Sequence, residues 1–109
     1  MTEIWHNPRC GKSRETLALL ESRGINPRIR RYLDDPPTEA DLRAALAALG
    51  QPAHALLRWK DAPDLDPGMG EDAVIATLAA RPALIERPLV IHGGRAALGR
   101  PPESVLALF

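Results

Sequence analysis

The sequence predicts an α/β protein with one mixed sheet of about four strands flanked by helices. Strand-like segments lie near both ends of the chain, and helical segments with clear end signals lie between them. A Gly-Gly dipeptide joins the last two strand-like segments. The resulting order is a βαβ unit, a helical insertion at about residues 38–81, and a ββα unit. Since 109 residues suffice for one core, we expect a single domain over residues 1–109.

The first unit begins with residues 1–5, whose loose alternation is typical of a short strand. Residues 12–23 predict a helix that ends at Gly24. Residues 28–33 predict a second strand, and its three arginines favour an edge position, because charges there discourage pairing with another chain.

The insertion begins with the strongest helix signal in the chain. Thr38 and Asp41 have the spacing of a capping box, and Gly50 ends a helix whose apolar residues recur at i, i+3, i+4 and i+7: Leu42, Ala45, Leu46 and Leu49. Residues 53–59 predict a short helix, 61–70 a loop, and 71–80 another helix stopped by Arg81-Pro82.

The last unit contains a hairpin and a closing helix. Residues 89–92 and 95–98 flank Gly93-Gly94, the dipeptide of a tight hairpin turn. Residues 101–109 predict a final helix with proline near its first turn.

Composition excludes several classes of function. Lys plus Arg and Asp plus Glu both total 14, so no overall basic field attracts nucleic acid or an anionic membrane. Apolar stretches are short and no leader-like segment opens the chain, so we expect a cytoplasmic protein. The single cysteine excludes a disulfide within the chain, so any redox partner thiol comes from another molecule.

The stretch "HNPRCGKSR" can be compared with two known anion-binding loops. A nucleotide-binding P-loop needs glycine at the place of His6, and Pro8 lacks an amide that such a loop uses. A tyrosine-phosphatase loop places more residues between its Cys and Arg than the three that separate Cys10 from Arg14. Neither loop fits this sequence.

A third interpretation places Cys10 between a strand and a helix that starts near Lys12. The free N–H groups and the dipole of that helix start favour a thiolate and a bound oxyanion, and Arg9 and Arg14 add positive charge. The alternative is that Cys10 is only a small buried apolar residue, as a lone cysteine usually is.

The segment "IWHNPRCGKSRETLALLESRGI" resembles the N-terminus of the glutaredoxin-coupled, ArsC-like arsenate reductases. The blocks "RYLDDPPTEADLRAAL", "ALLRWK", "LIERPLVI" and "LGRPPESVL" continue the similarity in the same order, over nearly the whole chain. The resemblance implies a thioredoxin-like fold with a helical insertion, which agrees with the predicted order of elements.

The resemblance also implies a reaction without a bound cofactor or a metal. Cys10 would attack arsenate, glutathione as co-substrate would displace the arsenic as arsenite, and glutaredoxin as partner would remove the resulting mixed disulfide. Ser13 stands where a dithiol oxidoreductase has its second cysteine, so a monothiol cycle with glutathione remains.

Carried over to this sequence, the resemblance makes Cys10 the nucleophile and assigns oxyanion binding to three arginines, Arg58, Arg87 and Arg100. Planar guanidinium groups bind the oxygens of a tetrahedral anion in pairs and keep their charge. Pro88 is the candidate for the cis proline that thioredoxin-like folds carry beside the active thiol.

Three further residues are assigned supporting roles. His6 either orients the loop and tunes the thiol, or only forms a hydrogen bond at the strand end. The hydroxyl of Ser13 either caps the helix, which we expect, or bonds the thiolate. Arg14 supplies positive charge.

Two alternatives stay open. The compact "HGG" turn differs from the longer turn of other members, so an ArsC-like monothiol protein with another thiol or oxyanion substrate is one of them. Relatives with this fold also act as redox-responsive regulators that bind RNA polymerase. Those typically carry Cys-x-x-Cys, and Ser13 argues against this second alternative.

Overall fold

A four-stranded mixed sheet forms the centre of the computed structural model, which describes residues 1–109, in the order β2-β1-β3-β4. β1 (Thr2–Trp5) runs parallel to β2 (Arg28–Arg30) and antiparallel to β3 (Leu89–His92), which pairs antiparallel with β4 (Arg95–Leu98). This topology confirms the predicted α/β class and the thioredoxin-like arrangement of a βαβ and a ββα unit.

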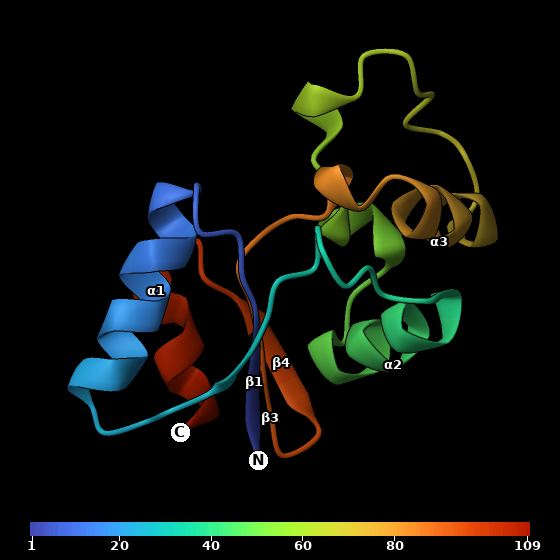
Figure 1. Ribbon diagram of the computed structural model, residues 1–109. Helices are drawn as coiled ribbons and strands as arrows, with labels where there is room; N and C mark the ends of the chain where they lie inside the picture. The colour runs from blue at the N-terminus through green and yellow to red at the C-terminus, as the bar shows by residue number, and fades with distance from the viewer.

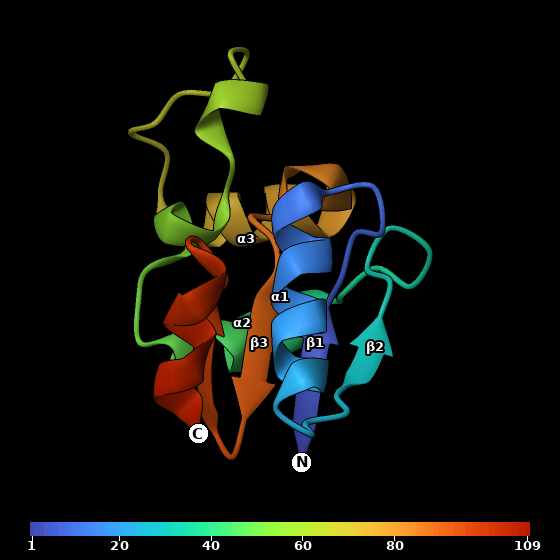
Figure 2. The same cartoon turned by 90° about the vertical axis from the view of Figure 1, so that its left-hand side faces the viewer.

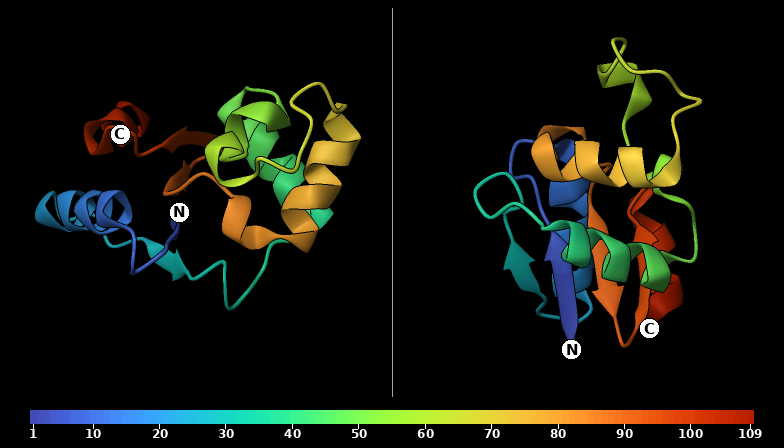
Figure 3. Two further views of the ribbon diagram at one scale, coloured as in Figure 1. Left: turned by 90° about the horizontal axis from the view of Figure 1, so that it is seen from above. Right: turned by 90° about the vertical axis from the view of Figure 1, so that its right-hand side faces the viewer.

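Helices cover both faces of the sheet (Figure 1). α1 (Gly11–Ser22) and the C-terminal 3-10 helix η4 (Pro102–Leu108) lie side by side on one face, as Figure 2 shows. α2 (Glu39–Leu49) covers the opposite face of the sheet (Figure 3). α3 (Glu71–Ala80) packs against α2 and lies beyond the end of the sheet. None of these helices combines the length and hydrophobicity that a membrane crossing requires.

The alternation of side chains along the strands supplies two separate cores. Ile4 and Val90 belong to a cluster of five buried residues on the face that α1 and η4 cover. The other members are Leu20 of α1 and Val105 and Leu108 of η4. Trp5 and Leu89, the neighbours of Ile4 and Val90, belong to a cluster of 15 buried residues, built largely by the insertion. The insertion therefore contributes half of the buried apolar side chains of the protein.

The predicted helix over 12–23 corresponds to α1. Gly24 ends it as expected, with a φ of +75° and its N–H donating to the carbonyl of Glu21. The predicted strand over 28–33 is too long, because β2 stops at Arg30. A turn follows in which two N–H groups donate to the Arg31 carbonyl, and the Tyr32 side chain enters the larger core. The edge position of β2 is confirmed.

The capping box that opens α2 is confirmed. The Asp41 N–H donates to Thr38 Oγ1, and the Thr38 N–H donates to Asp41 Oδ2, each at 3.1 Å. Gly50 ends the helix in the left-handed conformation with a φ of +70°. Both ends of this helix follow from local sequence.

The short helix predicted over 53–59 is wrong as one element. Two 3-10 turns, η1 (Ala53–Leu56) and η2 (Trp59–Asp61), are separated by a pair of non-helical residues, of which Leu57 is extended. Leu57 of this pair forms an antiparallel bridge with Ile85, just after a third turn, η3 (Pro82–Leu84), that the sequence did not predict. Pairing with a distant segment has replaced the local helix.

The hairpin of β3 and β4 has the predicted bounds. Gly93 and Gly94 have φ values of +56° and +81°, the two left-handed positions of a type I′ turn. The closing helix over 101–109 is 3-10 throughout rather than α. Its bonds span three residues, as from the Phe109 N–H to the Leu106 carbonyl, and two successive prolines supply no N–H at its start.

Candidate active site

Three chain segments that carry predicted site residues meet at one end of the sheet. Trp5, the last residue of β1, pairs with Leu89, the first of β3, which in turn pairs with Leu98, the last of β4. Because these strands are antiparallel, the segments after β1, before β3 and after β4 converge. The predicted residues on them are Cys10, Arg87 and Arg100.

Cys10 is the N-cap residue of α1. Its backbone is extended, with φ −91° and ψ 122°, and its carbonyl accepts the first helical bond from the Arg14 N–H at 3.0 Å. The Sγ atom is partly exposed and lies 3.6 Å from Nη2 of Arg100, which donates to it. The thiol is therefore accessible and in contact with a cation, which excludes the interpretation of Cys10 as a merely buried apolar residue.

The surroundings of the thiol lower the pKa of Cys10 below its ordinary value. Burial alone would raise this pKa, but the N–H groups of Ser13 and Lys12 and the guanidinium of Arg87 stabilise the thiolate as donors. The charge of Arg100 acts in the same direction. The helix start and two arginines together make Cys10 a nucleophile suited to attack on an electrophilic centre.

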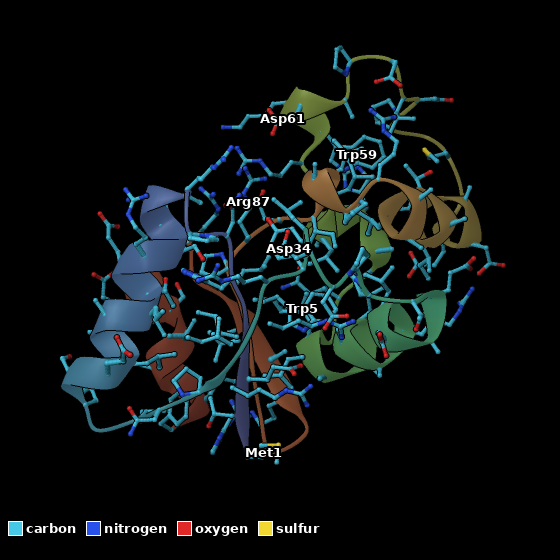
Figure 4. All side chains as sticks on the ribbon, viewed as in Figure 1. Met1, Trp5, Asp34, Trp59, Asp61 and Arg87 are labelled. Carbon is cyan, nitrogen blue, oxygen red and sulfur yellow. The ribbon has the colours of Figure 1, made fainter.

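Arg87 has an unsatisfied donor. Its Nε is buried and has no hydrogen-bond partner, while its Nη1 makes only long contacts of 3.4 and 3.5 Å with backbone carbonyls. A buried guanidinium N–H without an acceptor is costly, so an acceptor that arrives from outside would be favoured. Figure 4 shows Arg87 in the space between α1 and the insertion, below Asp61.

Arg58 reaches the site from the insertion, between η1 and η2. Its side chain is only 10% exposed, its Nε donates to Asp61 Oδ2 at 2.8 Å, and its Nη1 donates to Glu86 Oε1 at 2.8 Å. The same Glu86 oxygen lies 2.8 Å from Nε of Arg100. A carboxylate therefore connects two of the three predicted oxyanion-binding arginines.

His6 and Ser13 form a buried pair beneath the loop. Nδ1 of His6 and Oγ of Ser13 are 2.5 Å apart, and the same hydroxyl accepts the Asn7 N–H at 3.0 Å. The predicted capping role of Ser13 is wrong, because no side chain caps α1 and the hydroxyl bonds the preceding loop instead. His6 bonds Ser13 rather than the thiol, so the pair orients the loop that presents Cys10.

Burial lowers the pKa of His6, and the charges of Arg31 and Arg14 lower it further. The imidazole is therefore neutral at neutral pH. The guanidinium of Arg14 donates to the Pro8 carbonyl at 3.0 Å rather than to the Cys10 thiol. Its position braces the loop, and its charge acts on His6.

The Arg87–Pro88 peptide bond, the expected cis proline, is cis in the structure, and so is Arg100–Pro101, which the sequence did not predict. Gly99, just after β4, packs against Pro88 and Thr16, and its N–H donates to the Pro88 carbonyl at 2.9 Å. These three residues form a closely packed corner at the end of the sheet. No group of His, Cys, Asp and Glu side chains is arranged to hold a metal ion.

Comparison with known proteins decides the family. Residues 5–108 match the ArsC family. The chain belongs to the ArsC family. This membership confirms the resemblance carried by the five sequence blocks.

ArsC-family relatives of similar length match almost the whole chain. An arsenate reductase of Neisseria meningitidis serogroup A is 43% identical over 97% of this chain and 96% of its own. An Escherichia coli protein called YfgD is 44% identical, with 97% of this chain and 94% of its own covered. The solved structure of an arsenate reductase from Vibrio cholerae superimposes with a TM-score of 0.91 at 42% identity, over 99% of this chain and 97% of its own.

Sequence reasoning missed two residues of this ArsC-family site, Glu86 and Asp61. Each holds an arginine at 2.8 Å, although an isolated acidic residue in a sequence is most simply interpreted as a solvated side chain. The available signal was the position of Glu86, which directly precedes Arg87 in "ERP". Nothing in the local sequence distinguishes Asp61.

Proposed function

We propose that this protein reduces arsenate to arsenite, with Cys10 as the nucleophile. The observation that carries the proposal is a thiol at a helix start, in contact with Arg100 and beside the unsatisfied buried N–H of Arg87. Membership of the ArsC family and relatives named arsenate reductases, 43% and 42% identical over almost full length, support the same reaction.

In the first step the Cys10 thiolate attacks the arsenic(V) of arsenate. An S–As bond forms and one As–O bond breaks, with the leaving oxygen taking protons to become water, so no electrons have yet moved to arsenic. Arg87, Arg100 and Arg58 would bind the remaining oxygens, because guanidinium groups stabilise the charge that builds on them.

In the second step two electrons reach arsenic. The glutathione thiolate attacks Cys10 Sγ, the S–As pair stays with arsenic, and arsenite leaves while a Cys10–glutathione disulfide forms. A glutaredoxin thiol then attacks the glutathione sulfur and releases Cys10 as thiolate. The sum is two thiols oxidised for one arsenate reduced.

The source of the electrons follows from the cysteine count. Cys10 is the only cysteine, and the buried Ser13 occupies the position of a resolving thiol, so both reducing thiols come from other molecules. Glutathione and glutaredoxin meet this need in the reducing cytoplasm, where we place the protein. The same buried serine disfavours a Cys-x-x-Cys switch of the kind found in polymerase-binding regulators.

The test is a coupled assay of NADPH consumption with glutathione, glutathione reductase and glutaredoxin, with and without arsenate. Arsenate-dependent turnover is expected from the wild-type protein and not from Cys10→Ser, which should fold normally. Absence of arsenate-dependent turnover from folded protein with a reactive thiol would contradict the proposal. Omitting glutaredoxin separately tests the partner.

A further inference from the structure

Glu86 occupies a central place among the arginines of the site. Its Oε1 lies 2.8 Å from Nη1 of Arg58, which comes from the insertion, and 2.8 Å from Nε of Arg100, which follows β4. The Glu86 side chain is 21% exposed. A charge-assisted contact to two guanidinium groups at this degree of burial fixes both more firmly than a surface ion pair would.

The backbone holds Glu86 firmly in this position. The Glu86 N–H donates to the Leu56 carbonyl at 2.6 Å, and the Arg58 N–H donates to the Leu84 carbonyl at 2.8 Å, on either side of the Leu57–Ile85 bridge. The carboxylate and the Arg58 side chain thus start from paired backbone segments. The next residue is Arg87, whose side chain faces Cys10.

Carboxylates already offset part of the positive charge of the site before any ligand arrives. Three guanidinium groups, of Arg58, Arg87 and Arg100, lie with the carboxylates of Glu86 and Asp61 and the thiol of Cys10. An incoming dianion therefore competes with Glu86 for an N–H group of Arg58 and for the charge of Arg100, whose Nε–H donates to the Arg87 carbonyl at 2.8 Å. Removal of the Glu86 charge would make the site more positive.

We propose that Glu86 is a positioning residue of the oxyanion site: its carboxylate orients Arg58 and Arg100 toward the bound anion, and its charge limits how tightly that anion is held. The inference rests on the proposed function, because it takes the arginine cluster to be the oxyanion site. It assigns Glu86 no contact with the substrate.

The test uses inorganic phosphate, an unreactive tetrahedral analogue of arsenate, as the probe. Its dissociation constant is measured from the protection that it gives Cys10 against alkylation by iodoacetamide, so no turnover is needed. The proteins compared are the wild type, Glu86→Gln and Glu86→Ala, with Glu3→Gln as the matched control. Glu3 has a similarly buried side chain, 24% exposed, and pairs with one arginine, Arg28, on the first strand.

Glu86→Gln keeps an acceptor oxygen and loses the charge, so phosphate should bind roughly three- to tenfold more tightly than to the wild type. Glu86→Ala loses the same charge and also the acceptor, so it should bind phosphate several-fold more weakly than Glu86→Gln, because Arg58 and Arg100 lose the oxygen that they share and keep only Asp61 and the Arg87 carbonyl as partners. The Glu3→Gln control should not change the affinity. Circular dichroism checks that every variant is folded.

Three outcomes overturn the inference. Equal affinities of Glu86→Gln and Glu86→Ala would show that the side chain does not orient the arginines. An unchanged affinity of Glu86→Gln would show that its charge does not act on the anion. Absence of any protection in the wild type would remove the anion site itself. Failure of arsenate turnover, with the phosphate results as expected, would instead contradict the proposed reaction alone.

Discussion

The sheet and the helical insertion position their site residues by different means. Cys10 stands at a helix start and Arg87 and Arg100 just beyond strand ends, so the backbone of the sheet determines where their main chains lie, and Arg100 Nε also donates to the backbone carbonyl of Arg87. Arg58 stands between two short 3-10 turns and is held by side-chain contacts to Asp61 and Glu86. The comparison indicates that the sheet fixes the reacting group, whereas the insertion contributes a charge that depends on its carboxylate partners.

The largest effect is expected where the backbone of the sheet corner is packed most closely. A Cβ built on Gly99 would overlap Thr16 Oγ1 and would lie 2.7 Å from Pro88 Cγ. Gly99→Ala should therefore lower the free energy of unfolding by about 2–4 kcal/mol and reduce activity in the folded fraction, because the corner that carries Arg100 must move. Chemical denaturation measures the change.

Gly11→Ala is the control for this substitution. Its Cβ would meet only Nη2 of Arg14, at 3.9 Å, within a helix that favours alanine, so stability should be unchanged or slightly higher. If Gly99→Ala were as stable as the control, the close packing at this corner would not matter for the fold.

Substitution of Arg100 or Arg58 by lysine compares an arginine that follows a strand of the sheet with one that the insertion contributes. Lysine keeps the charge and loses the planar pair of donors. Arg100→Lys should lower kcat/KM for arsenate by roughly 100-fold, because this arginine contacts Sγ, whereas Arg58→Lys should cost roughly tenfold. Stability should change little in both. Equal losses would contradict the division of roles between sheet and insertion.

A smaller effect, confined to the insertion, is expected from the capping box. Thr38→Ala removes the acceptor of the Asp41 N–H and should lower the free energy of unfolding by about 1 kcal/mol, with unchanged kcat/KM. Thr77→Ala serves as control, because its exposed hydroxyl bonds only the Ala73 carbonyl within α3. A loss of activity in folded Thr38→Ala would connect α2 to the site more directly than the structure indicates.

The smallest effect concerns pH. Since the pKa of His6 is lowered in the folded protein, the unfolded chain takes up the proton first when the pH falls below about 6.5, the ordinary histidine value. The contribution of neutral His6 to the free energy of unfolding is thus fully present above that pH, and it is lost as the pH falls toward the lower pKa of His6 in the folded protein. The thermal midpoint should drop on acidification more in the wild type than in His6→Asn, because the asparagine amide is able to form a hydrogen bond but does not titrate. Identical pH profiles would contradict this.

Much of the fold could be predicted because its signals are local. The capping box at Thr38, the stop at Gly50 and the Gly93-Gly94 turn each lie within a few residues of the element that they bound. The elements that were wrong depend on distant partners. Tyr32 leaves β2 because the larger core takes its side chain, and Leu57 interrupts the helix because Ile85 pairs with it.

The site divides in the same way. The position of Cys10 at a strand-to-helix junction is visible in the sequence, and the family resemblance supplied the three arginines. The contacts between side chains were not visible. Ser13 was expected to cap its own helix, yet its hydroxyl bonds His6, and Glu86 gains its role only because the fold places it between arginines 42 residues apart in sequence.

The pairing of β1 with β3 also has a consequence for biosynthesis. β1 is a central strand with β2 on one side and β3 on the other, and Thr2 pairs with His92, so β1 lacks one of its two neighbours until residues 89–92 have emerged. Arg87 and Arg100 reach Cys10 only with the last hairpin, so the nascent chain carries an ordinary thiol and gains its reactive one only when the sheet closes.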